Sequence, residues 1–476
     1  MVYLNAPVSE PTASTPDLTL GFDAGSLLLH GLARDASLAS LAEGFTWDAR
    51  VHRFRAPAYA YREIVTLLTR AARTGVITFR DDARGYSALP LEHRATREPF
   101  GYQREAIERW TAAGRKGVVV LPTGSGKSYV AEMAMLAVQR STLVVAPTLD
   151  LMNQWHAGLG TAFGIEVGLL GGGVNDVRDV TVSTYDSAYI HMDRLGGRFG
   201  FLVFDECHHL PSPTYLHAAE CAIAPYRLGL TATLERTDGR EALLDARVGP
   251  VVYEKGIREL AGEYLADYDV QSVNVALEPD EAERYAAQRE VYRAFVRDSG
   301  IQMGAPDGWS RFIMLSSRSP EGRRAFMAYR DQKQIAVAPR RKLEVLATLL
   351  REHAGDRVLI FTNDNETVYR IARGFLIPAL THQTPLKERA EILARFNSGA
   401  YPVVVTSRVL NEGVNIPEAS VAVILSGTGS VREHVQRLGR ILRRKEGKRA
   451  VLYEVITVDT VEQWVSERRR EHDAYR

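Results

Sequence analysis

The apolar residues of this 476-residue chain fall into two long stretches that share one alternating pattern. In the first stretch, each apolar run is followed by a short polar loop and a helical pattern; the runs are "VVVL", "TLVVA", "VTVST" and "FLVF". Near-continuous apolar strands of this kind are typical of a parallel sheet that helices cover on both faces. The runs "DRVLIFT", "VVVTS", "AVILSG" and "AVLYEVI" repeat the pattern later. We therefore expect an α/β fold with two domains, residues 95–278 and 339–476.

Three further segments have patterns of their own. In residues 17–92, "LTLGF", "LLLHGL" and "VITFR" predict strands and "YREIVTLLTRAARTG" predicts a helix that ends at Gly75, so a small α+β module is expected. Residues 1–16 are rich in Pro, Ser and Thr, and we expect them to be mobile. Residues 279–338 predict helices in which Lys and Arg are interleaved with aromatic residues. Such a segment can grip phosphates and stack on bases, or its aromatic residues can form the core of a helical hairpin.

Composition excludes several classes of protein. The formal net charge is only +1, so a nucleic-acid surface would have to be a local patch. Cys207 and Cys221 are the only cysteines, which excludes a disulfide framework and fits a reducing compartment. No apolar run approaches the roughly 18 residues of a membrane span, and the N-terminal segment lacks a signal-peptide pattern. We expect a cytoplasmic protein without a membrane partner.

The segment "VVVLPTGSGKSYV" joins an apolar strand to a helix through a glycine-rich turn. Glycines permit the turn and expose backbone N–H groups, and the start of the helix favours an anion. A lysine here can reach the β- and γ-phosphates of ATP, and a serine hydroxyl can bind Mg²⁺. Leu121 departs from the strict phosphate-loop pattern, and the alternative is a glycine turn with a chance Gly-Lys-Ser. The residues predicted to bind the nucleotide are Thr123, Gly124, Ser125, Gly126, Lys127 and Ser128.

The segment "GFLVFDECHHLPSP" places Asp205, Glu206, Cys207, His208 and His209 directly after an apolar strand. All five could bind a metal, but consecutive side chains cannot all converge on one ion. Ligands of open α/β sheets bind at the carboxyl edge of the strands, where the two acids would lie. We expect the aspartate to hold Mg²⁺ and the glutamate to orient or deprotonate the attacking water. The first histidine then couples the phosphate to a neighbouring element, the second is structural, and the cysteine is buried.

The order of these motifs resembles superfamily 2 helicases. "GYQREAI" resembles the Q motif, which implies that Gln103 reads the adenine edge. "VVAPTLDLMNQW" and "VSTYDS" resemble motifs Ia and Ic, "GLTATLERTDG" motif III, "VLIFTNDNE" motif IV and "VVVTSRVLNEGVNIPEAS" motif V. The resemblance implies that Gly413 contacts the nucleotide. It also implies DNA contacts at Pro147, Thr148, Thr184, Arg236, Asp238 and Thr406.

The segment "REHVQRLGRILRR" closely resembles motif VI. Gln436, Arg437, Arg440 and Arg443 recur at steps of three and four residues, so they share one helical face. The resemblance implies that this face closes over ATP, that Arg440 and Arg443 act as arginine fingers, that Arg437 contacts the nucleotide and that Gln436 meets His208. Taken alone, the pattern would predict a solvated basic helix.

Within the superfamily, the chain resembles the XPB (xeroderma pigmentosum group B) helicases of compact archaeal and bacterial type. The segments "DECHH" and "SGTGSVREHVQRLGRILRRKEGK" carry this resemblance. Thr237 replaces the middle acid of the family's Arg-Glu-Asp element, and Asn415 replaces an aspartate of motif V. The resemblance covers about residues 95–476. The N-terminal module resembles the damage-recognition domain more weakly, and residues 279–338 stand where the family has a thumb.

The resemblance implies two RecA-like domains and an ATP- and Mg²⁺-dependent DNA helicase or translocase. It further implies 3′→5′ polarity, a role in nucleotide excision repair, duplex and single-stranded DNA as substrates, a nucleoid-associated prokaryotic location and, by analogy with archaeal relatives, a nuclease partner. Two alternatives stay open. One is another superfamily 2 translocase of restriction or phage type, and the other is a non-processive DNA-binding switch driven by ATP.

Overall fold

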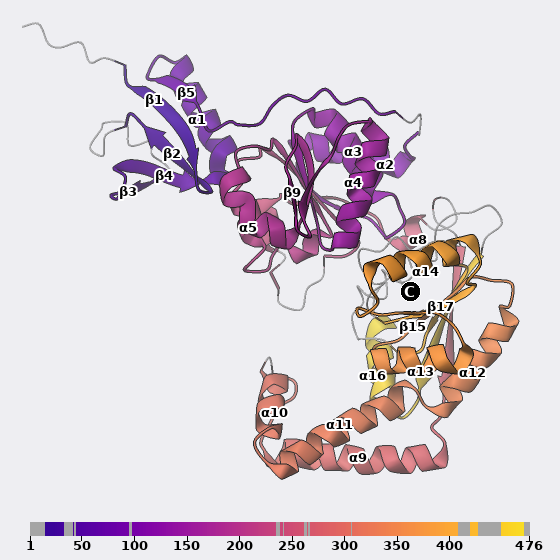
Figure 1. Cartoon of the computed structure of the whole chain (residues 1–476). Helices are drawn as coiled ribbons and strands as arrows, with labels where there is room; N and C mark the ends of the chain where they lie inside the picture. The colour runs from indigo at the N-terminus through magenta and orange to yellow at the C-terminus, as the bar shows by residue number, and fades with distance from the viewer. Residues whose placement is uncertain are drawn as a thin grey trace, which may run out of the picture. The chain divides into compact units, whose positions relative to one another are not determined.

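The computed structural model describes residues 15–32, 41, 44–94, 98–234, 239–240, 242–260, 264, 267–305, 307–407, 419–426 and 449–470. The chain divides into two compact units. The first comprises Met1–Val120 with Ser128–Glu254, and the second comprises Leu121–Lys127 with Lys255–Arg476. Figure 1 shows the helices and strands of each unit.

The first unit begins with a small α+β module. Its five strands lie in the order β3-β4-β2-β1-β5, and all neighbours are antiparallel except β1 and β5. Leucines at alternate positions of β1 and β2 point to one face, which Ile64 and Leu68 of α1 help to cover. The elements are β1 (Asp17–Asp23), β2 (Ser26–His30), β3 (Thr46–Asp48), β4 (Arg53–Pro57), η2 (Ala58–Ala60), α1 (Tyr61–Arg73) and β5 (Thr78–Asp81).

The rest of the first unit is the first α/β domain, built on an eight-stranded sheet. The order is β13-β6-β12-β11-β7-β10-β8-β9, and all neighbours are parallel except the β8–β9 hairpin. The strands are β6 (Lys116–Val120), β7 (Thr142–Ala146), β8 (Gly168–Gly171), β9 (Val174–Asp176), β10 (Val180–Thr184), β11 (Phe201–Asp205), β12 (Tyr226–Thr231) and β13 (Val251–Glu254). The helices are α2 (Gly101–Ala112), α3 (Lys127–Val138), α4 (Leu149–Phe163), α5 (Tyr185–Leu195), η3 (Cys207–His209), α6 (Leu216–Glu220) and α7 (Ala242–Arg247).

The second unit contains the second α/β domain. Its sheet is wholly parallel, in the order β14-β19-β18-β15-β17-β16. The strands are β14 (Asp267–Val275), β15 (Val358–Phe361), β16 (Ala379–Leu380), β17 (Val403–Thr406), β18 (Val421–Ile424) and β19 (Arg449–Thr457). The helices are α8 (Ile257–Leu260), α12 (Arg340–Glu352), α13 (Asn365–Phe375), α14 (Leu386–Ser398) and α16 (Val461–Arg470).

Strand β14 pairs with β19 over its whole length, so the second sheet receives a strand from before residue 279. The boundary that the sequence places at 278 therefore lies later than the start of this sheet. The sequence pattern does not reveal this strand, because β14 lies at the edge of the sheet. It is half exposed and mixes polar with apolar residues, so it lacks the continuous apolar run of a central strand.

Between β14 and α12 the chain forms a helical arm of α9 (Pro279–Asp298), α10 (Gly308–Ser316) and α11 (Pro320–Val337), which extends from the second sheet in Figure 1. Its aromatic residues pack on one another. Phe312 is fully buried, and ring centroids lie 5.3 Å apart for Tyr292–Phe312 and 5.0 Å apart for Trp309–Tyr329. Most of these rings therefore form the core of the arm, which was one of the two expectations from the sequence.

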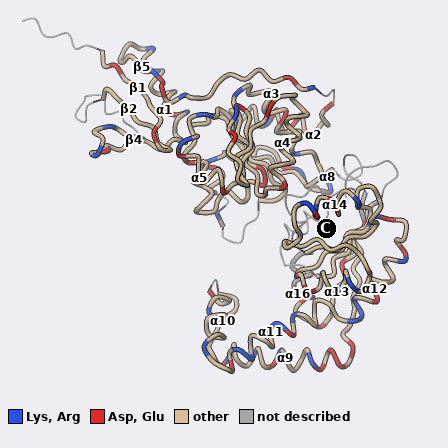
Figure 2. The backbone as a smooth tube through the Cα atoms, viewed as in Figure 1, with Lys and Arg blue, Asp and Glu red and all other residues tan. Residues whose placement is uncertain are grey.

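Basic and acidic residues are interspersed along the described parts of the tube in Figure 2, in keeping with the small net charge. In the part of the chain that the structure describes, no helix is both long and apolar enough to cross a bilayer.

Candidate active site

A glycine-rich loop joins β6 to α3. Residues Leu121–Lys127 leave the carboxyl end of β6, and α3 begins at Lys127, which is the strand–turn–helix arrangement that the sequence predicts. Gly124 and Gly126 have φ angles of 87° and 80°, a left-handed conformation in which a side chain would be strained. Ser128, in the first turn of α3, is exposed and can offer its hydroxyl to a ligand.

The polar groups of this loop fit a phosphate ligand. The ammonium of Lys127 donates to the carbonyl oxygens of Leu121 at 3.1 Å and Pro122 at 3.3 Å. The Ser125 hydroxyl also donates to Pro122, at 2.7 Å. The hydroxyl oxygen of Thr123 is buried and has no hydrogen-bond partner among the described residues. Because charge-assisted bonds to phosphate are stronger than bonds to carbonyl groups, a nucleotide would draw the ammonium from its own loop.

The two acids lie at the same edge of the sheet as the end of β6. Asp205 is the last residue of β11 and Glu206 follows it; β6, β12 and β11 are parallel neighbours, so they finish at one edge. Both acids are buried, at 6% and 8% exposure. Glu206 has φ 45° and ψ 53°, a conformation that costs a non-glycine residue about 1–3 kcal/mol and is concentrated at functional sites.

The donor set fits a magnesium–nucleotide complex. Mg²⁺ prefers oxygen ligands, which the Ser128 hydroxyl and the Asp205 carboxylate supply, and it completes its shell with phosphate and water. The Oε2 atom of Glu206 is buried without a hydrogen-bond partner among the described residues. A buried carboxylate oxygen without a donor is unfavourable, so this atom is suited to accept a proton or hydrogen bond from a bound water.

Asp205 is held by two helices that the sequence did not connect with it. The indole Nε1 of Trp155, on α4, donates to Asp205 Oδ2 at 2.7 Å, and the hydroxyl of Tyr185, on α5, donates to the Asp205 carbonyl oxygen at 3.0 Å. Burial, together with the neighbouring Cys207 and Asp205, raises the pKa of Tyr185 well above its usual value, so the phenol stays a neutral donor. One helix thus orients the carboxylate, and the other holds its backbone.

His208 is linked to the end of β12. Its Nδ1 lies 3.0 Å from the hydroxyl oxygen of Thr231, and that hydroxyl donates to the Thr233 carbonyl at 2.7 Å. Nδ1 also lies 3.5 Å from Glu206 Oε2. The sequence identified Thr231–Thr233 as the Thr-Ala-Thr of motif III but did not pair it with His208. The histidine therefore contacts both the acidic segment and the strand beside it.

The remaining members of the 205–209 cluster point elsewhere. Cys207 is fully buried in the apolar core of the first α/β domain, and a Cβ on Gly229 would lie 3.0 Å from its sulfur. The ring of His209 lies beside those of His208 and Tyr185, at 4.3 and 6.1 Å. Among the residues that the structure describes, no group of three or more His, Cys, Asp or Glu side chains is arranged to hold a metal ion.

Gln103 is completely buried in the first turn of α2. Its side-chain oxygen accepts a hydrogen bond from the backbone N–H of Phe100 at 3.0 Å. Phe100 is 38% exposed and stacks on Tyr102, with ring centroids 5.8 Å apart. Gln103 thus holds the backbone that presents this accessible ring, and its expected contact with the adenine edge stays a prediction.

Pro147, Thr148 and Thr184 lie where α4 and α5 begin. The Thr148 hydroxyl caps α4 by accepting from the Leu151 N–H at 3.3 Å, and the Thr184 hydroxyl caps α5 by accepting from the Ser187 N–H at 3.2 Å. Thr184 is 7% exposed, so its hydroxyl serves chiefly to position the helix.

A glycine turn that was not predicted from the sequence packs against these two helix starts. Gly171, Gly172 and Gly173 form the β8–β9 turn, all with positive φ. A Cβ on Gly171 would lie 3.3 Å from Thr184 Cγ2, and one on Gly172 would lie 3.0 Å from Leu149. A Cβ on Gly173 would meet open space. The signal was present as three consecutive glycines in "LLGGGVND".

Thr406, at the end of β17, is completely buried, and its hydroxyl donates to the Ser407 carbonyl at 3.1 Å. The other predicted residues lie outside the residues that the structure describes; they are Arg236, Asp238, Gly413, Gln436, Arg437, Arg440 and Arg443.

Three family models match the chain. Residues 20–83 match the xeroderma pigmentosum group B helicase damage recognition domain, residues 96–236 the res subunit of type III restriction enzymes, and residues 341–445 the helicase conserved C-terminal domain. The three matched regions follow one another along the chain without overlap.

Two curated relatives align over most of the chain. The DNA 3′-5′ translocase XPB2 of Sulfurisphaera tokodaii is 38% identical over 422 residues, which cover 83% of this chain and 96% of that protein. The DNA 3′-5′ helicase XPB of Kineococcus radiotolerans is 30% identical over 376 residues, covering 76% of this chain and 60% of that protein. The Pyrococcus furiosus Hef helicase domain matches with a TM-score of 0.54 at 18% identity, covering 78% of this chain and 98% of that one, and shows the fold alone.

Proposed function

The chain belongs to the XPB family of DNA helicases, and from this premise we propose that it is an ATP-hydrolysing motor that moves along DNA or opens it in the 3′→5′ direction. Its engine is a pair of RecA-like domains, and its cofactors are ATP and Mg²⁺. The res-subunit model matches only residues 96–236, whereas the XPB2 relative aligns over 83% of the chain. That difference favours an XPB motor over a restriction-type translocase.

For the chemical step, Lys127 binds the β- and γ-phosphates and Ser128 and Asp205 hold Mg²⁺. The metal, when bound, neutralises charge that develops on the transferring phosphoryl group. Glu206 accepts a hydrogen bond from the attacking water through its buried Oε2 and takes its proton. Gln103 reads the adenine edge, as the Q-motif resemblance implies, and it holds the backbone of Phe100, whose exposed ring can stack on the base.

Residues of the second α/β domain complete the reaction. Arg440 and Arg443 stabilise charge on the γ-phosphoryl group as arginine fingers, and Arg437 contacts the nucleotide. The family resemblance implies that Gln436 meets His208 and that Gly413 contacts the nucleotide. These roles are carried over from the family's motifs, because the segment lies outside the described residues.

On the first α/β domain, DNA is bound at the starts of helices α4 and α5, by Pro147, Thr148 and Thr184, and at the glycine turn Gly171–Gly173. Backbone N–H groups at helix starts and glycine turns bind phosphate without reading the base, which suits a motor that must move along any sequence. Thr406 and the segment of Arg236 and Asp238 add contacts by family resemblance.

One observation carries this proposal. Asp205 receives hydrogen bonds from Trp155 of α4 and Tyr185 of α5, and both helices begin at the predicted DNA contacts. A small shift of either helix on DNA would move the magnesium ligand. The arrangement therefore offers a direct mechanical path from DNA binding to ATP hydrolysis.

The proposal is tested by measuring ATP turnover with and without duplex and single-stranded DNA over a salt series. We expect DNA to stimulate turnover. The stimulation should fall steeply as the salt concentration rises, because counterion release from the DNA then contributes less to binding. In a strand-displacement assay, a duplex with a single-stranded 3′ tail should then be unwound, whereas a duplex with a 5′ tail should not. Turnover that ignores DNA at every salt concentration would contradict the motor, and stimulation without displacement or translocation would favour the DNA-binding switch.

We further assign the protein to nucleotide excision repair, with a nuclease as its partner and the prokaryotic nucleoid in the cytoplasm as its place of action. The match of residues 20–83 to a damage recognition domain supports the repair role. Affinity purification from the native host, with and without nuclease treatment to remove bridging DNA, would identify the partner.

A further inference from the structure

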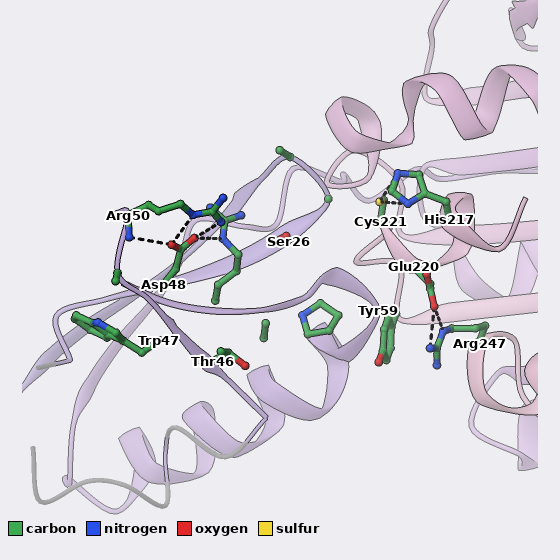
Figure 3. Close-up of a pocket in the computed structure, with 16 residues that line it drawn as sticks. Ser26, Thr46, Trp47, Asp48, Arg50, Tyr59, His217, Glu220, Cys221 and Arg247 are labelled. Atoms are coloured by element: carbon green, nitrogen blue, oxygen red, sulfur yellow. Dashed lines mark hydrogen bonds and ion pairs between the residues drawn. The ribbon is translucent and has the colours of Figure 1, made fainter. Parts of the chain in front are cut away.

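A pocket of about 790 Å³ lies between the N-terminal module and the first α/β domain (Figure 3). The β3–β4 hairpin and Tyr59 form its wall on the module, and α6 and the last residue of α7 form the opposite wall. Pockets of about 300–1,000 Å³ are the size that binds small organic groups. None of the residues that line it belongs to the sites assigned above to ATP or DNA.

The two walls are fixed relative to each other. Arg62 of α1 donates to the Gly114 carbonyl oxygen at 2.8 Å, and Ile223 of the first α/β domain is part of the module's apolar core. Gly25 adopts φ 74° against Cys221, where a Cβ would lie 2.5 Å from the sulfur. Only glycine permits this approach. The pocket is therefore preformed rather than assembled by movement of the module.

Where the two walls meet, the Tyr59 ring of the module stacks with the Arg247 guanidinium of the α/β domain. The Arg247 guanidinium lies 4.0 Å from the centre of the Tyr59 ring and is held by Glu220 at 2.8 Å. Behind it, the completely buried Arg227 donates to four carbonyl oxygens, including those of Ala222 and Arg247. Burial lowers the pKa of Arg227 to about 10, which still leaves it charged at neutral pH. This wall is thus rigid, planar and edged with polar groups.

The β3–β4 hairpin, on the module side of the pocket, presents two further guanidinium groups. Asp48 accepts from Arg50 at 2.9 Å, as the dashed lines between these two residues in Figure 3 show, and from Arg55 at 3.2 Å. The carboxylate is 9% exposed, whereas the Arg50 side chain is 84% exposed. Asp48 therefore holds Arg50 by one edge and leaves the remainder of its guanidinium accessible. Three arginines and two acids line the pocket, so it carries a small positive charge.

These features fit a nucleotide better than other ligands. A base can stack on the Tyr59–Arg247 wall, its edge can bond to the hydroxyls of Ser26 and Thr46, and its phosphate can meet Arg50. Five charged side chains line the pocket, which disfavours a wholly apolar ligand. Arg and aromatic side chains are the groups with which proteins bind bases that have left the duplex.

We propose that this junction pocket binds one unpaired nucleotide of the DNA on which the motor acts. The inference rests on the proposed function, because it requires a DNA substrate. It gives the N-terminal module a readout of strand distortion that depends on the first α/β domain for half of its surface. A lesion or mismatch weakens the pairing and stacking of a base, so that base costs less free energy to extrude. The pocket would therefore favour damaged or mismatched sites.

The test measures binding of the full-length protein to two duplexes that differ only by one unpaired 2-aminopurine nucleotide. We expect tighter binding of the bulged duplex and quenched fluorescence of the base in the complex. Tyr59→Leu should remove at least about fivefold of the preference, since stacking on an aromatic ring contributes a factor of this order or more. Tyr59→Phe should retain the preference, because it keeps the ring.

Arg50→Ala has a matched control in Arg80→Ala. Each arginine pairs with an aspartate two residues away on the module and is largely exposed, at 84% and 71%, but Arg80 does not line the pocket. Both variants lose the same charge near DNA. Only Arg50→Ala should lose preference for the bulged duplex, and its exposed position makes loss of folding an inadequate explanation.

Equal effects of Arg50→Ala and Arg80→Ala on both duplexes, or an unquenched base, would overturn the inference. Quenching of free 2-aminopurine deoxynucleoside monophosphate, sensitive to Tyr59→Leu, with no preference for the bulged duplex would assign the pocket to a free nucleotide and overturn its role on a strand. These outcomes are separate from failure of the motor, which would show as ATP turnover that DNA does not stimulate.

Discussion

The Nδ1 atom of His208 lies 3.0 Å from the hydroxyl oxygen of Thr231, and this contact determines the tautomer of the histidine. The Thr231 hydroxyl donates its hydrogen bond to the Thr233 carbonyl oxygen at 2.7 Å. Toward the His208 ring the same hydroxyl can therefore only accept a hydrogen bond. His208 therefore carries its proton on Nδ1. In the neutral imidazole Nε2 is then an acceptor, which is what an amide donor such as that of Gln436 requires.

Thr231→Val should therefore weaken coupling more than binding. The variant keeps the shape of the side chain but removes the acceptor that orients His208. We expect DNA-stimulated turnover to fall about tenfold, as for residues that orient a metal-site group, while DNA affinity stays close to that of the parent. Turnover and DNA binding measured side by side check this.

Thr181→Val is the matched control for this experiment. Thr181 is also completely buried in a strand of the same sheet, and its hydroxyl bonds to the N–H and carbonyl of Arg178. Loss of a buried hydrogen-bonding hydroxyl should cost each variant about 1–3 kcal/mol of stability. If both lose turnover equally, the effect of Thr231 is one of stability and the orienting role is wrong.

Lys127→Ala and Glu206→Gln should separate nucleotide binding from hydrolysis. Removing the ammonium of Lys127 takes away the charge that meets the phosphates, so ATP affinity should fall. Glu206→Gln keeps the size of the side chain but cannot take a proton, so ATP should still bind and turnover should drop by about 10²–10⁴. Steady-state ATPase with a fluorescent-nucleotide binding assay distinguishes the two, and near-normal turnover of Glu206→Gln would refute the assigned base.

Trp155→Phe should lower turnover beyond its cost in stability. The change removes the indole N–H that holds Asp205 Oδ2 and leaves a smaller aromatic ring at a buried position. We expect a loss of about tenfold in DNA-stimulated turnover that higher Mg²⁺ partly restores, because the aspartate loses its orientation. Measurement of turnover against Mg²⁺ concentration shows this.

Trp110→Phe supplies the comparison, since Trp110 is also buried in the first α/β domain and its N–H bonds to the Arg227 carbonyl oxygen at 2.9 Å. Its loss should destabilise the domain but leave the Mg²⁺ dependence unchanged. The same Mg²⁺ profile in both variants would argue against a path from α4 to the magnesium ligand.

Arg440→Ala and Arg443→Ala should lower kcat strongly and change ATP affinity less. An arginine finger contributes roughly 10³–10⁵-fold to turnover in related phosphoryl transfers. Lysine should rescue poorly, because an ammonium cannot reproduce the bidentate guanidinium fork. Arg437 belongs in the same series, because its spacing predicts that it shares the helical face of Arg440. DNA-stimulated turnover that survives loss of both Arg440 and Arg443 would end their assignment.

Local sequence predicted those parts of the molecule in which one segment carries its own signal. The phosphate loop and the acids after β11 are of this kind, because strand, turn and helix follow one another along the chain. Trp155 and Tyr185 could not be connected with Asp205 in this way, since 50 and 20 residues separate them and only the order of strands brings them together. Strand β14 was missed for another reason: its half-exposed edge position removes the apolar run that marks a central strand.

The aromatic residues of the helical arm show the limit of composition. Tyr292 and Tyr329 are interleaved with arginines in the sequence, which fits a DNA surface, yet burial raises the pKa of both phenols and their rings pack at 5.3 Å. Spacing along a helix does not distinguish a ring that faces its partner helix from one that faces solvent when both faces carry charges.

In the second α/β domain, Lys342 of α12 is completely buried. Its ammonium donates to both Glu462 of α16 and the Leu425 carbonyl oxygen. The Glu462 carboxylate also accepts from the Thr457 N–H at 3.0 Å. Breaking a buried ion pair by removing one partner leaves the other charge uncompensated, so Lys342→Met should cost about 3–5 kcal/mol of unfolding free energy. Adding Glu462→Gln removes that charge and keeps an acceptor for Thr457, so the double variant should recover a large part of the loss. As a comparison, the exposed pair Arg395–Glu391, treated in the same way, should lose less than about 1 kcal/mol. Thermal and urea unfolding of the four variants check the order. A double variant no more stable than Lys342→Met would show that the lysine stabilises the domain through Leu425 rather than through its charge on Glu462.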